Sequence, residues 1–319
     1  MEYLGEQNFQ IRNKAFAAAN VIPFRYPLRT GRHPCGTLMG LPEPADVRYA
    51  GESHDAERPI NVVVLDRSED AAFAARVAVH AGAALLALRA ERGFADQAAL
   101  RAEGDRRSHE LLVAELARHR PGDAVLSEEG KDDPIRLTAE RVWIVDPLDG
   151  TREYAEEGRA DWAVHVALWT RGKGLTAGAI ALPAQGLGLD SGRPPAVPER
   201  SDAPVRLAAS RTRPPAFLRG LTERLGGVEV PMGSAGAKIA AVISGEVDAY
   251  VHAGGQYEWD SAAPVAVAVA AGLHCSRVDG SPLEYNRADP RLPDLVVCRP
   301  ELAEPILSHL REAGVGKDE

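Results

Sequence analysis

Two carboxylates three positions apart close an apolar segment near the middle of this 319-residue chain. Residues 143–152 read Trp-Ile-Val-Asp-Pro-Leu-Asp-Gly-Thr-Arg, so a strand would deliver Asp146 and Asp149 to one turn. Carboxylate oxygens bind hard cations such as Mg2+, and free backbone amides at Gly150 and Thr151 can bind phosphate. The same residues also fit an ordinary turn, because Asp-Pro and Asp-Gly steps are common punctuation.

Two further acidic segments favour a metal site over an ordinary turn. Glu128 and Glu129 end a short apolar segment that is typical of a buried strand, and Asp260 lies at the start of an Ala/Val-rich helix. Each segment alone also fits a solvated strand end or a helix N-cap. Together these acids provide four oxygen-ligand sites at the ends of three separate elements. Mg2+ ions bridged by phosphate need such a set of oxygen ligands.

The order and spacing of these motifs resemble the inositol monophosphatase superfamily of Mg2+-dependent, lithium-sensitive phosphatases. Residues 146–151 match the motif D-P-[LI]-D-G-[TS], residues 127–129 match the acidic motif before it, and residues 259–263 match W-D-x-A-A. The resemblance extends over residues 68–310. It implies an α/β fold in which helices and sheets alternate as an αβαβα sandwich.

The resemblance also implies a cofactor of two or three Mg2+ ions and a set of ligands for them. One ion would be held by Glu128, Asp146 and the carbonyl of Leu148. A second would be held by Asp146, Asp149 and Asp260. Metal ions lower the pKa of a bound water, which makes it a nucleophile, and stabilise the oxygen that leaves.

In this superfamily a Thr of the turn pairs with an Asp of an earlier helix to take the proton from that water. Thr151 matches the turn residue, and Asp105 matches the earlier Asp. Ala102 and Gly104 depart from the T-x-A-D pattern of the superfamily, which leaves the match incomplete. The alternative role for Asp105 is the N-cap of a helix that follows it.

Substrate contacts are expected where small residues open a later helix. Small residues let a ligand approach the backbone, and in the superfamily the segment matched by Gly233, Ser234 and Lys238 contacts a sugar or a second phosphate. Lys238 also fits a solvated helix lysine. Glu258 is a candidate for binding a ribose hydroxyl. Three further side chains are candidates for a base pocket or for ordinary packing: His252, Tyr257 and Trp259.

The residue after the turn narrows the type of phosphatase. Glu153 gives D-G-T-R-E-Y, which resembles 3'(2'),5'-bisphosphate nucleotidases, whereas inositol monophosphatases more often have Asn there. The resemblance is closest to actinobacterial nucleotidases of sulfur assimilation, and it implies hydrolysis of adenosine 3',5'-bisphosphate to AMP and phosphate. Inositol monophosphatase or fructose-1,6-bisphosphatase activity is an alternative. A non-catalytic phosphate-binding protein on this fold is another, which the complete set of acids disfavours.

The composition fits a globular enzyme with a small phosphate ester as its partner. Hydrophobic residues make up 45% and charged residues 26% of the chain. A net charge of -9 disfavours a nucleic-acid polymer. Three dispersed cysteines and no signal peptide predict a cytoplasmic protein. No apolar run reaches the length of a membrane span, residues 77–88 being too short, so no membrane partner is expected. A homodimer is left open.

The chain divides into three predicted parts. Residues 1–64 form an N-terminal extension that is expected to be mostly irregular, with a helix at 12–19, because six prolines interrupt it. Residues 65–195 form an N-terminal α/β half with the metal-binding motif, and residues 196–319 form a C-terminal α/β half that completes the site. A linker is expected at 186–204. Helices are predicted at 68–92, 105–118, 215–225, 237–243, 261–271 and 302–312, and strands at 124–126, 142–145, 162–169, 175–182, 205–209, 228–230, 249–252, 274–278 and 295–298.

Overall fold

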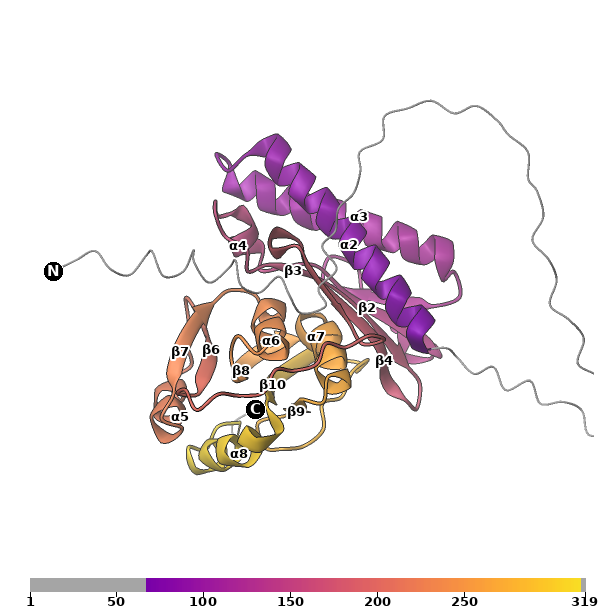
Figure 1. Cartoon of the computed structure of the whole chain (residues 1–319). Coiled ribbons are helices and arrows are strands. Elements are labelled where there is room, and N and C mark those ends of the chain that lie inside the picture. The colour runs from indigo at the N-terminus through magenta and orange to yellow at the C-terminus, as the bar shows by residue number, and fades with distance from the viewer. Residues whose placement is uncertain (1–66, 317–319) are drawn as a thin grey trace, which may run out of the picture. The chain divides into compact units, whose positions relative to one another are not determined.

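The computed structural model describes residues 67–316, so the predicted extension over residues 1–64 and its helix lie outside the described residues (Figure 1). The helices are α2 (Arg67–Arg92), α3 (Gln97–His119), α4 (Thr151–Ala155), α5 (Leu218–Arg224), α6 (Ala235–Ile243), α7 (Glu258–Ala270) and α8 (Ala303–Glu312). The strands are β1 (Ala124–Ser127), β2 (Arg141–Asp149), β3 (Ala163–Thr170), β4 (Gly174–Leu182), β5 (Leu187–Asp190), β6 (Arg206–Ser210), β7 (Val228–Met232), β8 (Ala249–Tyr257), β9 (His274–Ser276) and β10 (Arg291–Cys298).

The strands form two five-stranded mixed sheets. The first sheet has the order β1-β2-β3-β4-β5, in which β1 and β2 are parallel and the other neighbours are antiparallel. The second has the order β7-β6-β8-β10-β9, in which β6 is parallel to both of its neighbours and β10 is antiparallel to both of its own. The first sheet therefore lies wholly within the predicted N-terminal half, and the second within the C-terminal half.

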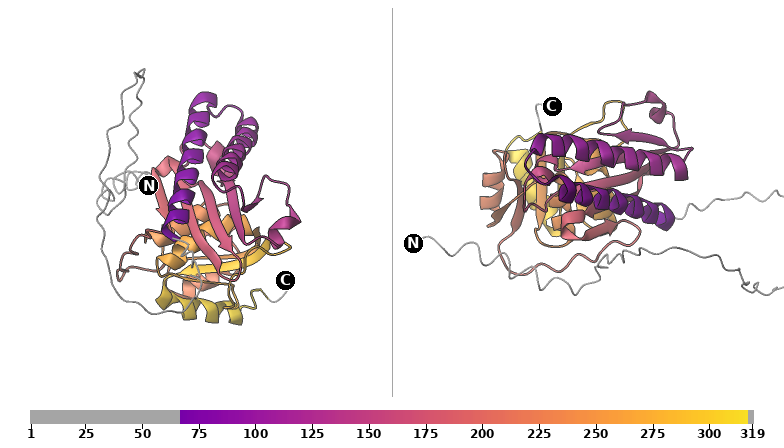
Figure 2. Two further views of the ribbon diagram at one scale, coloured as in Figure 1. Left: turned by 90° about the vertical axis from the view of Figure 1, so that its right-hand side faces the viewer. Right: turned by 90° about the horizontal axis from the view of Figure 1, so that it is seen from above.

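Alternation of side chains along β2 shows how the layers are built. Successive strand residues point to opposite faces of a sheet. Trp143 and Val145 join a core under α2 and α3, whereas Val142 and Ile144 join a second core against α6 and α7. A third core lies between the second sheet and the helices α5 and α8. Figures 1 and 2 show the resulting order of helices, sheet, helices, sheet and helices, so the predicted αβαβα sandwich is confirmed.

The central helices α6 and α7 pack against both sheets. Their inward residues are mostly Ala and Val, and they share one buried cluster with residues of β2, β3 and β4 on one side and of β8 and β10 on the other. Small side chains let backbones approach closely. At Gly178 in β4, a Cβ atom would lie 2.6 Å from Cβ of Ala266 and 2.9 Å from the carbonyl oxygen of Ala263. The two predicted halves are therefore joined through a common middle layer.

Several elements differ from the sequence-based prediction: β2, β8 and β10 are longer, and α4 was not predicted. Helix α3 begins eight residues before the predicted start, because Asp96 caps it by accepting a hydrogen bond from the backbone N–H of Ala99 at 2.9 Å. Asp105 consequently lies in the interior of α3, and the N-cap role considered for it is wrong. Strand β5 lies within the predicted linker, where it forms an edge of the first sheet.

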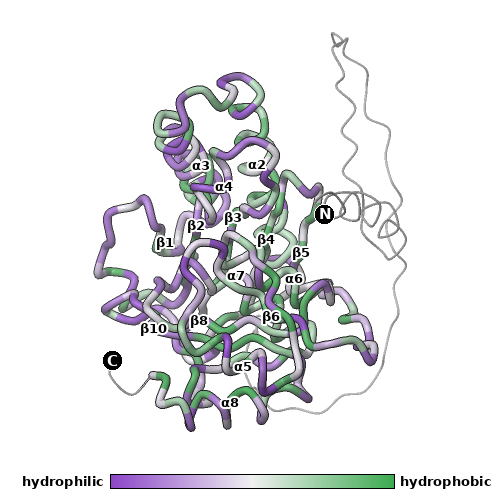
Figure 3. Tube along the Cα trace, turned by 90° about the vertical axis from the view of Figure 1, so that its left-hand side faces the viewer, coloured by the Kyte–Doolittle hydropathy of each residue, from purple (hydrophilic) through white to green (hydrophobic). Residues whose placement is uncertain are grey.

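Helix α2 differs from the expectation that no apolar segment could span a membrane. By length and composition alone, residues Glu69–Arg92 are long and apolar enough to cross one. Within the protein, however, Phe73, Val77 and Leu85 are buried in the core between α2, α3 and the first sheet. The apolar face of α2 is thus used in packing. Figure 3 shows hydrophobic, green segments of the trace mainly in the packed strands and helices rather than in the peripheral loops.

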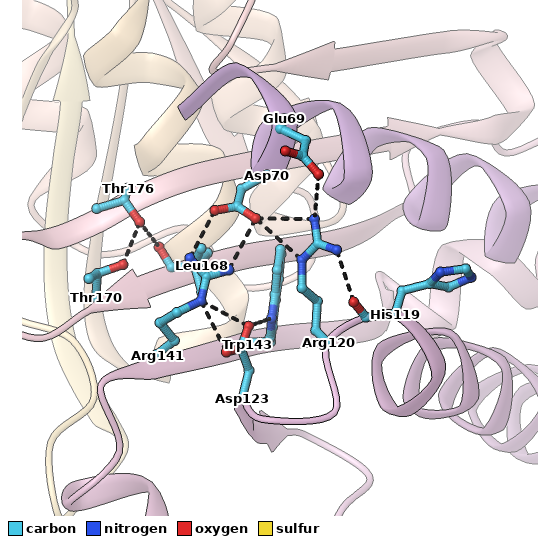
Figure 4. A network of polar contacts seen from close by, with 10 residues as sticks. All are labelled: Glu69, Asp70, His119, Arg120, Asp123, Arg141, Trp143, Leu168, Thr170 and Thr176. Atoms are coloured by element: carbon cyan, nitrogen blue, oxygen red, sulfur yellow. Dashed lines mark hydrogen bonds and ion pairs between the residues drawn. The ribbon is translucent and has the colours of Figure 1, made fainter. Parts of the chain in front are cut away.

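A network of charged groups joins the elements at the start of β2 (Figure 4). Asp70 of α2 accepts hydrogen bonds from Arg141 at 3.0 and 3.1 Å and from Arg120 at 3.3 Å. Arg141 also donates to Asp123 at 3.0 Å, and Asp123 accepts from the indole N–H of Trp143 at 2.8 Å. The network fixes one end of β2 against α2 and α3, and the opposite end of the same strand carries the acidic turn.

We expect Gly178→Ala to lower the free energy of unfolding by about 1–3 kcal/mol, because the new methyl group would overpack the contact between β4 and α7. Urea denaturation measures this loss. Gly122→Ala is the matched control, since a Cβ atom there meets nothing within 4 Å, and it should change stability by no more than about 0.5 kcal/mol. Equal stability of the two variants would contradict the close packing of the middle layer.

Candidate active site

The end of β2 brings two acids to one place. In a regular strand, residues three apart point to opposite faces, but the pairing of β2 with β3 shifts register between Asp146 and Asp149. Such an irregularity redirects side chains. Both acids are buried, and together with Asp260 they offer carboxylate oxygens that all lie within 4.8 Å of one another. Three of the predicted ligands therefore form one cluster.

The hydrogen bonding of Asp146 fits a metal ligand. Its Oδ1 atom accepts the backbone N–H of Leu148 at 3.0 Å. Within residues 67–316, its Oδ2 atom is buried and has no hydrogen-bond partner. A buried charged oxygen without a partner is costly, and a divalent cation would satisfy it. Oxygen ligands of this kind are those that Mg2+ prefers.

The acids also raise one another's pKa values. Burial, and then the neighbouring Glu128 and Asp149, raise the pKa of Asp146 well above its usual value. Burial and Asp149 raise the pKa of Asp260 to about 7. Glu128 is exposed as a residue, yet desolvation of its carboxyl group, with the nearby charges of Asp149 and Glu129, raises its pKa to about 7. A bound cation would offset this repulsion.

Asp149 is fixed by the first turn of α6. Its carboxylate accepts hydrogen bonds from Ser234 Oγ at 2.5 Å, from the N–H of Gly236 at 2.6 Å and from the N–H of Ala235 at 3.2 Å. Ser234 also caps α6 by accepting the N–H of Ala237 at 2.9 Å. The N-terminus of a helix stabilises negative charge. The segment of small residues predicted to contact substrate thus uses these amides to hold Asp149, a predicted metal ligand.

The turn after Asp149 needs a glycine for two reasons. Gly150 has φ of +80°, a left-handed conformation, and a Cβ atom there would lie 2.9 Å from Cβ of Ser234. Glycine therefore lets the turn approach α6. Thr151 begins α4, and its hydroxyl donates to the carbonyl of Leu148 at 3.1 Å. Two of the predicted site residues, the Leu148 carbonyl and the Thr151 hydroxyl, are in direct contact.

Asp105 approaches the site from α3. Burial, followed by the nearby Glu129, raises its pKa to about 7. Gly104 explains a departure from the superfamily pattern, because a Cβ atom there would lie 2.8 Å from the ring of Tyr154 and 3.0 Å from Leu148. The glycine lets α3 pack directly on the acidic turn. In the described residues the Thr151 hydroxyl donates to Leu148 rather than to Asp105.

Lys238 does not lie where a solvated lysine would. Its side chain is buried, its Nζ atom donates to the carbonyl of Ser234 at 2.7 Å, and it lies 5.0 Å from the centre of the Tyr250 ring. Burial lowers the pKa of Lys238, although Asp149 opposes the shift. The ammonium group is thus directed into the protein beside the acid cluster, and not toward the surface where a second phosphate was expected.

Glu258 has a structural contact in place of the expected ribose contact. It is fully buried, and its two carboxylate oxygens accept the backbone N–H groups of Asn286 at 2.6 Å and Arg287 at 2.7 Å. Burial raises its pKa, and these hydrogen bonds oppose the rise. Because both oxygens already bind amides, the ribose interpretation of Glu258 is corrected: this acid anchors the loop before β10 to the start of α7.

Glu153, which distinguished the sequence of the turn, packs on the same segment. It is buried, and its Oε1 atom accepts a hydrogen bond from Arg211 at 2.8 Å. A Cβ atom on Gly233 would lie 2.2 Å from Cδ of Glu153. The N–H of Gly233 donates to Asp161 at 2.5 Å. The side chain of Glu153 therefore fits only because residue 233 is a glycine. This contact links the acidic turn to the segment before α6.

Sequence reasoning missed His165. This residue of β3 is completely buried, with Nδ1 3.1 Å from the carbonyl of Trp259 and Nε2 3.4 Å from Asp149. A Cβ atom on Gly236 would lie 1.9 Å from Nε2. Burial lowers the pKa of His165. The available signal was a single polar residue in the apolar segment predicted as a strand at 162–169.

The five-layer fold and the carboxylate cluster at the end of β2 define the class of Mg2+-dependent phosphatases. The chain belongs to the Inositol monophosphatase family, which it matches over residues 66–314.

Relatives of known name agree with this assignment. The chain is 52% identical over 254 residues to the 3'-phosphoadenosine 5'-phosphate phosphatase of Mycobacterium leprae (strain TN), covering 76% of this chain and 94% of that protein. It is 30% identical over 192 residues to the 3'(2'),5'-bisphosphate nucleotidase CysQ of Escherichia coli (strain K12), covering 56% and 76%. The crystal structure of CysQ from Bacteroides thetaiotaomicron matches with a TM-score of 0.64 at 26% identity, covering 73% and 97%. The predicted resemblance to bisphosphate nucleotidases is confirmed.

The acid cluster predicts how stability depends on pH. Asp146, Glu128 and Asp260 bind protons more tightly in the folded chain than in the unfolded chain, whose carboxyl pKa values are near 4. The free energy of unfolding of the metal-free protein should therefore fall as pH rises from about 4 to about 7. Excess Mg2+ should raise Tm by several degrees at pH 8 and much less at pH 5.

Thermal unfolding with chelator and with Mg2+, across this pH range, measures both effects. Asp146→Asn is the informative variant, because loss of one acid should flatten the pH dependence of the metal-free protein. A Tm in chelator that stays level or rises between pH 5 and pH 8 would contradict the mutual repulsion of these carboxylates.

Proposed function

We propose that this protein hydrolyses adenosine 3',5'-bisphosphate to AMP and phosphate in the presence of Mg2+. The observation that carries the phosphatase chemistry is the cluster of three aspartates, two of them buried and Asp260 half-buried, in which one oxygen of Asp146 has no partner within residues 67–316. The choice of substrate is supported by the relative named 3'-phosphoadenosine 5'-phosphate phosphatase, of which 94% is covered at 52% identity. Glu153, the residue of the turn that resembles bisphosphate nucleotidases, also supports this substrate. It packs against Gly233 and accepts a hydrogen bond from Arg211.

Two groups of residues would hold the ions. Glu128, Asp146 and the carbonyl of Leu148 are proposed for the first position, and Asp146, Asp149 and Asp260 for the second. When bound, the ions would supply a water of lowered pKa and stabilise charge on the phosphoryl group and the leaving oxygen. The closeness of the three aspartate carboxylates supports the second group. The effect of the nearby Glu128 charge, which raises the pKa of Asp146, supports the first.

The other residues of the site have two roles in this proposal. Some accept the proton of the attacking water, and others hold the phosphate or the acids in place. We assign the proton of the attacking water to Thr151 and Asp105, because a carboxyl with a pKa of about 7 is suited to proton transfer near neutral pH. The backbone N–H groups of Gly150 and Thr151 would face the phosphate. Gly233, Ser234 and Lys238 would act on the substrate indirectly, by holding Asp149 and by placing one positive charge beside the acids.

The proposal includes a small-molecule partner and a cytoplasmic location. The substrate is a small phosphate ester, and the net charge of -9 disfavours a nucleic-acid polymer. The two cysteines in the described part of the chain, Cys275 and Cys298, are free thiols, which supports a reducing cytoplasm. Hydrolysis of adenosine 3',5'-bisphosphate, inositol 1-phosphate and fructose 1,6-bisphosphate, compared by kcat/KM with Mg2+, tests the choice of substrate. A preference for either of the last two would reject the nucleotidase assignment.

We expect Asp146→Asn to lower kcat at least about a hundredfold, because one carboxylate serves both proposed ion positions. Steady-state kinetics at saturating Mg2+ measures the loss. Asp202→Asn is the matched control, because Asp202 is exposed and far along the chain from the cluster. This variant should retain wild-type kcat. Asp146→Asn activity within about tenfold of wild type would rule out the shared-ligand arrangement.

The pairing of Asp105 with Thr151 predicts non-additive kinetics. If the two accept one proton as a unit, the double variant Asp105→Asn/Thr151→Ala should be little worse in kcat than either single variant. All three variants are compared with wild type under the same Mg2+ concentration. Losses that multiply would show that the two residues act separately, and would leave the Thr151 hydroxyl as a support for the Leu148 carbonyl alone.

A further inference from the structure

One buried polar side chain beside the acid cluster, that of His165, has no part in the proposed function. In the antiparallel pairing of β3 with β2, His165 lies directly opposite Asp146. Residues in such a pair have neighbouring Cβ atoms on the same face of the sheet. The Nδ1 atom of His165 lies 3.9 Å from Asp146 Oδ2, and its Nε2 atom lies 3.4 Å from Asp149 Oδ2. The imidazole ring is therefore in contact with two of the three aspartates.

A single hydrogen bond within residues 67–316 orients this ring. It joins Nδ1 of His165 to the carbonyl oxygen of Trp259 at 3.1 Å. A carbonyl oxygen can only accept, so Nδ1 carries the hydrogen and donates. The Nε2 atom is buried and has no hydrogen-bond partner among the same residues. The contact with Trp259 is thus the one that fixes how the ring lies.

The carbonyl that accepts this hydrogen bond belongs to the residue before Asp260, in the first turn of α7. The other two aspartates end β2, a strand of the first sheet. The carboxylate of Asp260 accepts the backbone N–H of Tyr257 at 2.6 Å, but this contact lies within the start of its own helix. The hydrogen bond from His165 to Trp259 instead joins β3, the neighbour of β2, to α7. It therefore connects the segment that carries Asp260 to the sheet that carries the other two acids.

The space for the ring depends on Gly236 of α6. A Cβ atom on Gly236 would lie 1.9 Å from Nε2 and 2.7 Å from Cε1 of His165. Any side chain at this position would displace the ring from the carbonyl of Trp259. The backbone N–H of Gly236 also donates to Asp149 at 2.6 Å. The same glycine thus holds one aspartate and makes room for the histidine that contacts the segment of another.

We propose that His165 is a positioning residue for the second ion position, and that it sets the place of Asp260 relative to Asp146 and Asp149 through its hydrogen bond to the Trp259 carbonyl. This role rests on the proposed function, from which the ion position is taken. Mg2+ demands near-ideal octahedral geometry, so its binding is sensitive to the separation of its ligands. Groups that orient metal ligands typically change metal affinity about ten- to a hundredfold when they are lost.

Calorimetric titration of the metal-free protein with Mg2+ tests this role without any substrate. His165→Leu removes the donor to Trp259 and should weaken Mg2+ binding about ten- to a hundredfold. His165→Asn should keep the affinity within about threefold of wild type, because its amide nitrogen can take the place of Nδ1 and donate to the same carbonyl. Thr170→Val is the matched control, since it removes a hydrogen bond with Thr176 at 2.8 Å from the far end of β3. This control should leave Mg2+ affinity unchanged.

Gly236→Ala tests the same role with the histidine still present. Its methyl group should displace the ring and weaken Mg2+ binding about tenfold or more. The double variant Gly236→Ala/His165→Asn should recover the lost affinity, because the shorter side chain leaves room for the methyl group and still reaches the Trp259 carbonyl. This pair keeps the test decisive if His165→Leu does not fold.

Unchanged Mg2+ affinity in His165→Leu, or in Gly236→Ala if the first variant does not fold, would overturn the role of His165. An equal loss in Thr170→Val would also overturn it, because the loss would then follow from reduced stability. Mg2+ binding that depends on His165 would support the role even if the wild-type enzyme did not hydrolyse adenosine 3',5'-bisphosphate. Hydrolysis of the bisphosphate by an enzyme whose Mg2+ affinity is insensitive to these substitutions would overturn the role of His165 and leave the proposed function standing.

Discussion

The hydrogen bonds between Asp149 and the first turn of α6 are the contact on which the site depends. A carboxylate at the end of β2 must face other carboxylates, and the amides of Ala235 and Gly236 with the Ser234 hydroxyl compensate part of that repulsion. The contact joins the first sheet to the middle layer. It also dictates small residues nearby, since side chains at Gly150 and Gly236 would occupy the space that the contact closes.

Much of the fold follows from local patterns in the sequence. Alternating apolar residues in β2 and β3 and the helical spacing of Phe73, Val77 and Leu85 are sufficient to predict elements, because they report which face of an element is buried. Asp146 and Asp149 could be predicted to meet because they lie on one turn, and the addition of Asp260 followed from the resemblance of the motifs to the superfamily. Boundaries were less predictable: the start of α3 depends on one side-chain cap, and β5 is a short edge strand in a segment rich in glycine and proline.

The remaining features of the site depend on contacts between residues far apart in the chain. Lys238 and Glu258 have the residue types of ligand-binding groups, but their partners, the Ser234 carbonyl and the amides of residues 286 and 287, are determined by how loops pack. His165 gave only the signal of one polar residue in an apolar strand. The departure at Gly104 had no local explanation, because its cause is the ring of Tyr154, which a different helix supplies.

The middle layer has a consequence for how the chain acquires its structure. The residues of α6 and α7 form one buried cluster with both sheets, so this middle core closes only when both halves are present, whereas the two outer cores each lie within one half. Docking of the two halves is consequently expected to be the folding step that closes the middle layer. The acids of the cluster come from both halves, since Asp146 lies on β2 and Asp260 on α7. The three carboxylates can therefore bind an ion together only after the two halves have docked. Ion binding would then act as a check on completed assembly.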